Sequence, residues 1–424
     1  MKGKRRDPVE ICKTVLIVLL SVSAAVLLYF SPLVQSSGLR DVFSKGLTDS
    51  DAGSAEPQTI PVAAVPVRMA VGLDAGLYGI QYDQTTVDAL FSQTAALLGE
   101  ALAGADKPAA ISESDWQTLL AGEYVYFGYT EPIPLPALCQ WLSGGDGTDK
   151  LDGSAAHILL ATQEDGTLAL CYQSGESFYR CATTLDADLH LGSVLGITAP
   201  NGSLFAFENQ ALSGTVAPYV LFTGGDTRAP SYAASAVTLT DDARTQLLSS
   251  LRFSAQNQAA VNDGSIFVDG DETVWLYNDG RVRYYTSGSS RYSAGEGLTG
   301  AVTAAWSLVD SALSTLCGEA RLCLTSAVED SSGSYTVTFG YLLNGSTVYL
   351  YDQGWAAQVQ VQNSAVTDFT LYPRSYSAGD EDSLLLPAEK AADALSGLSD
   401  TPRELVIQYR DTGTGSVIPG WVGR

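Results

Sequence analysis

The longest apolar stretch of the chain lies near its N-terminus, next to a group of basic residues. No charged residue occurs from Thr14 to Ser37, and residues 14–34 are almost continuously apolar. At about 1.5 Å per residue, a helix over this stretch is about long enough to cross a bilayer. Residues 1–13 carry five Lys or Arg against two Asp or Glu, a formal charge of +3. Because basic flanks stay in the cytoplasm, the pattern predicts a cytoplasmic tail (1–13), a transmembrane helix (14–34) and an extracytoplasmic remainder.

Small residues inside this helix have two interpretations. Ala24 and Ala25 also suit a signal-peptide cleavage site, but apolar residues continue well past them, which favours an uncleaved anchor. In a retained helix, Ser21, Ala24, Ala25 and Leu28 lie along one face. Ser21 and Ala25 form a small-x-x-x-small pair, which lets two helices approach closely. We therefore predict a membrane-helix interface at these four residues.

The hydrophobic pattern changes after the apolar helix. Residues 35–64 are rich in Ser, Gly, Ala and Pro and are typical of a linker. Residues 65–215 form a predicted N-terminal extracytoplasmic domain, with a helix near 84–102 and a helix start at Ser112. Alternating patterns predict its strands, with a hairpin turn at Asp165 and Gly166. These strands are expected at residues 124–129, 157–162, 167–172 and 178–183.

The rest of the chain repeats one pattern of a helix followed by short strands. A predicted helix at 241–252 precedes three strands, and a second at 298–316 precedes five more. Both segments indicate a helix followed by an antiparallel β-meander, so we predict a middle α+β domain (216–297) and a C-terminal α+β domain (298–424). They are expected to be two copies of one unit, with helices lying across antiparallel sheets. The predicted fold class is therefore α+β throughout the extracytoplasmic region.

The charge of the chain limits its possible functions, and the number of cysteines limits how they can pair. The formal net charge of the 424 residues is −24, so −27 remains outside the basic tail, and such an acidic region excludes nucleic-acid binding. Five cysteines follow the apolar helix, an odd number, so at least one is free or pairs with another chain. Cys171 and Cys181 flank a predicted hairpin turn. A cross-strand disulfide and buried reduced thiols both remain open for this pair.

The motifs that carry chemistry are weak, and they predict no catalytic, cofactor-binding or metal-binding residue. Gly295-x-Gly297-x-x-Gly300 follows a polar loop rather than a buried strand, which indicates a connector and not a dinucleotide site. The two histidines, His157 and His190, lack the spacing of metal ligands. The sequence contains no CxxC and no G-x-S-x-G. A pair of catalytic carboxylates, defined in space rather than by spacing, stays open.

Several local patterns resemble the YycH/YycI group of Gram-positive membrane proteins. These patterns are Trp116-x-x-Leu119 and residues 122–129, 133–141, 335–345, 386–391, 405–409 and 418–421. The resemblance implies a short cytoplasmic tail, one membrane helix and an exterior of repeated α+β domains. It also implies action on the sensor histidine kinase of an essential two-component system governing cell-wall metabolism, in complex with a related single-pass protein. The short linker and the cysteines depart from the group.

We therefore interpret the chain as a non-enzymatic, membrane-anchored regulator that associates with a sensor histidine kinase and a related single-pass regulatory protein. It contacts the lipid bilayer through one helix and needs no cofactor. Two alternatives remain from the residues alone. One is an exported cell-wall-active hydrolase that uses carboxylates, and the other is an extracytoplasmic ligand-binding module.

Overall fold

The structure is a computed structural model that describes residues 60–144, 150–223, 228–237, 240–256, 258–330, 332–351, 353–397 and 402–424. The chain from Thr59 to Arg424 forms one compact unit. The predicted tail, the membrane helix with Ser21, Ala24, Ala25 and Leu28, and most of the linker lie outside the described residues. Among the helices that are described, none is long and apolar enough to span a membrane.

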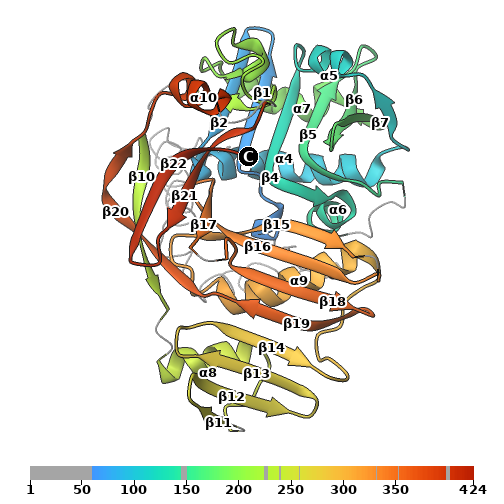
Figure 1. Ribbon diagram of the computed structural model, residues 1–424. Coiled ribbons are helices and arrows are strands. Elements are labelled where there is room, and N and C mark those ends of the chain that lie inside the picture. Colours follow the sequence, from blue (N-terminus) through green and yellow to red (C-terminus); the bar gives the residue numbers. More distant parts are fainter. Residues whose placement is uncertain are drawn as a thin grey trace, which may run out of the picture. The chain divides into compact units, whose positions relative to one another are not determined.

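The first sheet contains only antiparallel strand pairs and is built from the N-terminal part of the unit (Figure 1). Its strand order is β2 (Gly76–Gln81), β1 (Arg68–Leu73), β4 (Tyr124–Pro134), β5 (Ser154–Thr162), β6 (Thr167–Ser174), β7 (Ser177–Asp186) and β3 (Ala109–Ile111). The predicted turn between β5 and β6 is confirmed. Gly166 adopts φ +80°, and Asp165 accepts a hydrogen bond from the Thr167 amide at 3.0 Å.

Helices α4 (Gln84–Gly104), α6 (Leu135–Ser143) and α7 (Ala187–Ile197) pack on one face of the first sheet. The Asp83 side chain caps α4 by accepting from the Thr86 amide at 3.2 Å. The opposite face is covered by α5 (Glu113–Leu119) and residues 203–222. The predicted start of α5 is confirmed as a capping box between Ser112 and Asp115. Both faces of this sheet are therefore buried.

The second sheet is longer and joins strands from far apart in the chain. Its order is β11 (Gln258–Val261), β12 (Gly264–Asp269), β13 (Glu272–Tyr277), β14 (Val282–Thr286), β19 (Ala365–Leu371), β18 (Ala357–Gln362), β16 (Tyr335–Leu343), β17 (Ser346–Leu350), β21 (Leu405–Asp411), β22 (Ser416–Gly423), β10 (Arg228–Ala236) and β20 (Arg374–Leu384). Strand β15 (Arg321–Glu329) pairs with β16 off this path. Of the strand pairs described in this sheet, β17 with β21 is parallel and the others are antiparallel.

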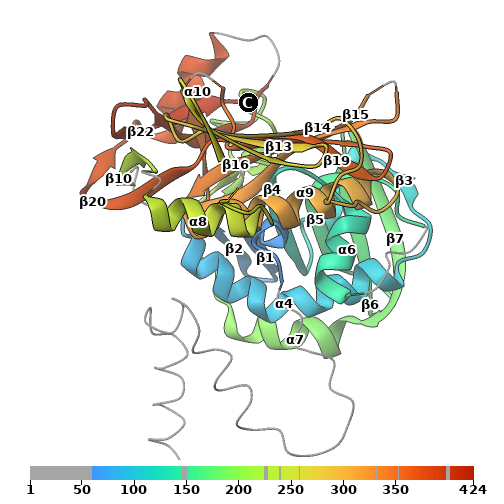
Figure 2. The same ribbon diagram turned by 90° about the horizontal axis from the view of Figure 1, so that it is seen from below.

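Helices α8 (Asp241–Ser250) and α9 (Gly297–Leu313) lie along one face of the second sheet (Figure 2). The helix-plus-antiparallel-strands pattern is confirmed, and the α+β class with it. Strand β14, from the predicted middle domain, pairs directly with β19 from the predicted C-terminal domain. The two predicted domains therefore share one sheet, because the strands that follow α8 extend the sheet formed by the strands that follow α9. The domain boundaries and the duplication stay predictions.

The described cysteines are buried free thiols. Cys171 is opposite Arg180 in the β6–β7 register, whereas Cys181 is opposite Leu170. Side chains of successive strand residues point to opposite faces, so Cys171 packs in the cluster under α5 and Cys181 in the cluster under α4. The cross-strand disulfide that the sequence left open is therefore not formed.

Candidate functional site

An ion-pair network centred on the buried Arg68 joins the two sheets. We call it the inter-sheet network and define it by six residues: Arg68, Tyr126, Glu131 and His157 of the first sheet, and Glu404 and Arg424 beside β21 and β22. Arg68 is only 2% exposed and contacts the carboxylate of Glu404. Arg424 donates to Glu404 at 2.7 Å and to Glu131 at 3.1 Å. Residues from both ends of the described chain therefore meet here.

The local backbone explains why a long cation fits between the two sheets. Arg68 begins the otherwise apolar strand β1 and pairs in register with Gly128 of β4. A Cβ atom at residue 128 would lie 2.4 Å from the Arg68 Cγ, so glycine is required for this close approach. Glu404 and Arg424 are held opposite each other by two reciprocal backbone hydrogen bonds of 3.0 Å. The network is therefore fixed by backbone structure on each side.

Burial and charge set the protonation states in this network. Burial alone raises the pKa of Glu404, but the positive charges of Arg68 and Arg424 outweigh it and lower that pKa to about 2. Burial, together with the nearby Arg68, lowers the pKa of His157 to about 4. Burial raises the pKa of Glu131, against the attraction of Arg424. At neutral pH, Glu404 is therefore ionised and His157 is uncharged.

The hydrogen bonds of Tyr126 assign the tautomer of His157. The Tyr126 hydroxyl lies 2.5 Å from His157 Nδ1 and keeps its own proton, since burial raises its pKa. Tyr126 therefore donates to Nδ1, and we assign the remaining ring proton to Nε2.

A cavity of about 450 Å³ lies beside the network. Its floor is a cross-strand row of the first sheet, in which Gln173 is in register with His157 on one side and with Phe178 on the other. The remaining lining residues come from α5, the β6–β7 turn, the 217–220 segment and the start of β21. They are Glu113, Glu176, Ala217, Pro218, Tyr219, Val220 and Glu404. The size falls within the roughly 300–1,000 Å³ of typical ligand pockets.

The chemistry of the cavity favours binding over acid–base catalysis. A general acid needs a raised pKa, whereas Glu404 is held ionised by two arginines. The Tyr219 hydroxyl donates to Glu113 at 2.8 Å, which keeps that carboxylate at the wall. Within the described ranges, no group of His, Cys, Asp or Glu residues could hold a metal ion.

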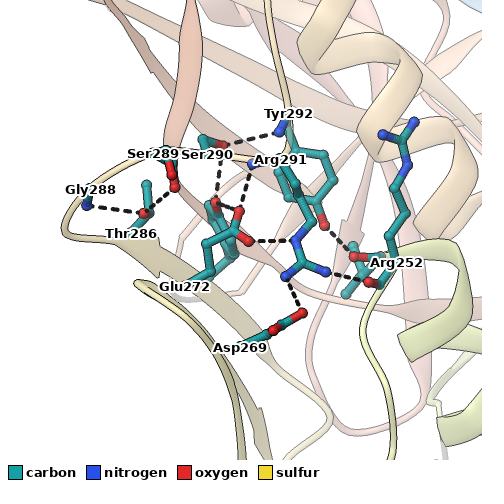
Figure 3. Close-up of polar contacts among 11 residues, drawn as sticks. Arg252, Asp269, Glu272, Thr286, Gly288, Ser289, Ser290, Arg291 and Tyr292 are labelled. Carbon is teal, nitrogen blue, oxygen red and sulfur yellow. Dashed lines mark hydrogen bonds and ion pairs between the residues drawn. The ribbon is translucent and has the colours of Figure 1, made fainter.

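A second polar cluster lies at the other end of the second sheet (Figure 3). Here Arg291 donates to Glu272 at 2.6 Å and to Asp269 at 2.8 Å, and its guanidinium lies 3.8 Å from the Phe253 ring centroid. Arg291 also donates to the carbonyl of Arg252, a residue with φ +57° at the end of α8. The contacts are satisfied locally and attach α8 to the β12–β13 turn, so we interpret this Arg291 cluster as structural.

The glycine motif singled out in the sequence lies at the start of α9, where Gly297 and Gly300 are found. The Gly300 position lies against the Gly295 backbone, with 2.1 Å from an added Cβ to the Gly295 carbonyl carbon, so these glycines serve a tight connection. Sequence reasoning missed the inter-sheet network. The available signal was a single arginine, Arg68, opening an apolar strand.

Comparison with known proteins bears on the fold. No protein-family model matches the chain, and no curated protein does. The structure is similar to the crystal structure of YycH from Bacillus subtilis, with a TM-score of 0.51 and 12% sequence identity. The match covers 85% of this chain and 98% of that chain. This chain therefore has a YycH-type fold, which confirms the resemblance at the level of the fold.

Proposed function

We propose that this chain is a membrane-anchored extracytoplasmic regulator that associates with a sensor histidine kinase controlling cell-wall metabolism. The fold likeness to YycH, which spans 98% of that chain, is the observation that carries this proposal. The charge pattern of residues 1–37 supports it independently, because it is typical of a single anchor with a cytoplasmic N-terminus. A related single-pass regulatory protein is the second proposed partner.

The internal construction of the unit supports a regulatory role in a specific way. A regulator must bias its partner between two states, which takes a coupling free energy of about 1–3 kcal/mol. Arg68 and Glu404, contributed by the two sheets, form an ion pair between these sheets, in which Arg68 is buried. A unit whose sheets are held in this way presents a fixed surface, and a fixed surface can favour one state of a partner over the other.

The test uses the full chain, tagged at its C-terminus, in its native membrane. A reporter active only outside the cytoplasm, fused after residue 60, is expected to be active. A histidine kinase is expected to copurify with the tagged chain. Recovery of a mature chain that begins near Val26 would overturn the anchor, and absence of a histidine kinase from the purified complex would overturn the association.

The proposed helix contact has its own test. Ser21→Leu with Ala25→Leu enlarges two small residues on the predicted interface, so it should reduce kinase recovery while protein level and topology stay unchanged. Leu19→Ala with Val26→Ala changes the opposite face and is the control, with a smaller expected loss. Equal kinase recovery in all variants would leave the region after residue 59 to carry the association.

A further inference from the structure

We propose that the second sheet binds a linear, uncharged glycan chain on the face opposite α8 and α9. The site takes two residues from each of three neighbouring strands, and we call it the open sheet face. Its residues are Thr273 and Trp275 of β13, Arg283 and Tyr285 of β14, and Asp368 and Thr370 of β19. The inference concerns a ligand site and does not depend on the kinase association.

Strand pairing places these six side chains together. They form two cross-strand rows, each with three residues in register. The rows are Trp275 with Arg283 and Thr370, and Thr273 with Tyr285 and Asp368. Directly opposed residues point to the same side of a sheet, and so do residues two positions apart along one strand. Both rows therefore share one face.

No described helix covers this face. Along β13 and β14, buried side chains alternate with exposed or part-exposed ones. The buried set, which includes Val274 and Tyr284, belongs to one hydrophobic core with residues of α8 and α9. Figure 1 and Figure 2 both show no described helix against the other side of β13 and β14. A ligand can therefore reach the open sheet face.

Two aromatic side chains on this face take no part in the hydrophobic core. Trp275 is part-exposed and Tyr285 is 45% exposed, and neither belongs to a hydrophobic cluster of the described residues. Tyr285 is two residues beyond Arg283, the partner of Trp275, so the two aromatic residues are diagonal neighbours with Cα atoms about 7–8 Å apart. Aromatic ring faces carry negative charge density and attract the C–H bonds on the flat side of a sugar ring.

The polar side chains beside the rings match sugar hydroxyl groups. Arg283 donates to Asp368 at 3.2 Å, and the two side chains are 51% and 27% exposed. A guanidinium group has five N–H donors, and an ionised carboxylate accepts through two oxygens. The pair therefore keeps both donors and acceptors within reach of a ligand. A sugar hydroxyl group can donate and accept, so it can use either kind.

The charges of this region favour an uncharged ligand. Arg283 is paired with Asp368, and the neighbouring Arg281 lies 3.9 Å from Asp279. Each of these two cations therefore has a carboxylate beside it, which leaves little net charge to attract an ion. The chain as a whole has a formal net charge of −24, which disfavours an anionic glycan.

The composition of the open sheet face also favours a glycan over a protein partner. The core of a protein interface is apolar and poor in charged residues. Here an ion pair and two threonines surround the two aromatic rings, so polar groups lie in the middle of the face. A β-1,4-linked glycan presents flat sugar rings with hydroxyl groups along both edges, which suits this mixture of rings and polar groups.

The experiment measures saturation-transfer NMR signals of oligosaccharides with the full chain in phosphatidylcholine nanodiscs, which contain no sugar headgroups. The probes are cellohexaose and chitohexaose, which are β-1,4-linked without and with a 2-acetamido group, and maltohexaose, which is α-1,4-linked and curved. We expect saturable binding of at least one β-linked probe in the millimolar range or tighter, and at least tenfold weaker binding of maltohexaose. The tighter β-linked probe shows whether the acetamido group is recognised.

Matched variants locate the site. Trp275→Ala and Tyr285→Ala should each weaken the β-linked probe at least fivefold. Because Tyr285 is 45% exposed, its variant should keep the urea unfolding midpoint of the wild type. Trp275→Phe keeps an aromatic ring and should retain most of the binding. Tyr351→Ala removes a tyrosine that is 54% exposed just beyond β17, and it should bind as the wild type does.

The proposal is wrong if neither β-linked probe binds saturably, or if maltohexaose binds as tightly as they do. Wild-type binding by both Trp275→Ala and Tyr285→Ala, or an equal loss in Tyr351→Ala, would place the glycan elsewhere and would also overturn it. Absence of glycan binding together with lower kinase recovery in Trp275→Ala would instead assign the open sheet face to a protein contact.

Discussion

The inter-sheet network and the Arg291 cluster both surround an arginine with carboxylates, but they connect the chain over different distances. Arg291 contacts residues between 252 and 292, all of one helix and its neighbouring strands. Arg68 meets Glu404, more than 300 residues away in sequence, and Arg424 adds a contact to Glu131. The Arg291 cluster therefore fixes a local turn, whereas the inter-sheet network joins two sheets.

The two regions also differ in their surroundings. Arg68 is 2% exposed and Arg291 is 17% exposed, so the inter-sheet arginine is more completely removed from water, whereas Glu404 is 16% exposed against 9% for Glu272. A cavity opens beside the inter-sheet network and includes two of its residues, His157 and Glu404. The charged cluster at the junction between the sheets therefore borders open space. A cluster within one turn serves packing alone.

The largest expected effect comes from Arg68→Met. This change leaves Glu404, only 16% exposed, with one of its two cationic partners, and breaking a pair that is largely removed from water costs roughly 3–5 kcal/mol of unfolding free energy. Urea unfolding of the full chain measures the loss. Arg68→Lys keeps the charge but not the planar fork, so it should cost less. A loss below about 1 kcal/mol for Arg68→Met would show that the pair does not hold the sheets together.

A smaller effect is expected for Arg291→Met, roughly 1–3 kcal/mol, because charged hydrogen bonds are lost from a partly exposed site. The loss should be local. Hydrogen exchange should accelerate in the segment from α8 to residue 292 and stay unchanged in the first sheet. Faster exchange throughout both sheets would contradict the distinction between a local and a long-range cluster.

The third prediction concerns acid. The folded pKa of His157 is about 4, below the value near 6.5 of a free imidazole, so the unfolded chain binds more protons between these values. The unfolding free energy should therefore fall as the pH drops from about 6.5 to 4, by roughly 1–2 kcal/mol for this partly exposed ring. The folded pKa of Glu404, about 2, extends the loss from about 4.5 down to 2.

His157→Gln isolates the histidine part of this acid effect. Glutamine retains hydrogen-bonding groups but does not titrate, so the stability profile between pH 6.5 and 4 should become flatter. Glu404 should still produce the loss below pH 4.5. An unchanged slope between pH 6.5 and 4 in this variant would assign the acid sensitivity to other groups.

The smallest effect is expected at an exposed ion pair between α4, which packs on the first sheet, and β15 of the second sheet. Arg321 of β15 donates to Asp88 of α4 at 2.6 Å, but the side chains are 38% and 34% exposed. Exposed ion pairs contribute about 0–1 kcal/mol, so Asp88→Asn should lower the unfolding free energy by no more than that. A loss as large as that of Arg68→Met would show that the exposed fraction of the paired side chains does not predict how much each ion pair stabilises the fold.

The sequence predicted local elements better than long-range pairing. The α4 and α9 helices and the β5–β6 hairpin follow from periodicity and turn residues, which act over a few positions. The strands β10 and β20 were missed, because segments rich in Ala, Ser and acidic residues carry little strand signal. The pairing of β14 with β19 depends on contacts across some 80 residues, which no local pattern encodes.

The candidate site was harder to predict than the fold. Glu404 and Arg424 lie at the ends of two largely apolar segments near the C-terminus and are indistinguishable in sequence from solvated charges at strand ends. Only the pairing of β1 with β4 and of β21 with β22 brings them to Arg68. The histidine that lines the cavity was noted for lacking metal-ligand spacing, and its actual partners, Tyr126 and Gln173, come from neighbouring strands.

The regulatory proposal is tested most directly by the activity of the kinase itself. The measurement is the autophosphorylation rate of the copurified histidine kinase in proteoliposomes. It is made with the full chain, with residues 1–58 alone, and without either. We expect the full chain to change the rate at least fivefold, as a coupling of about 1–3 kcal/mol implies, and residues 1–58 alone to have a smaller effect. An identical rate under all three conditions would contradict a regulatory function.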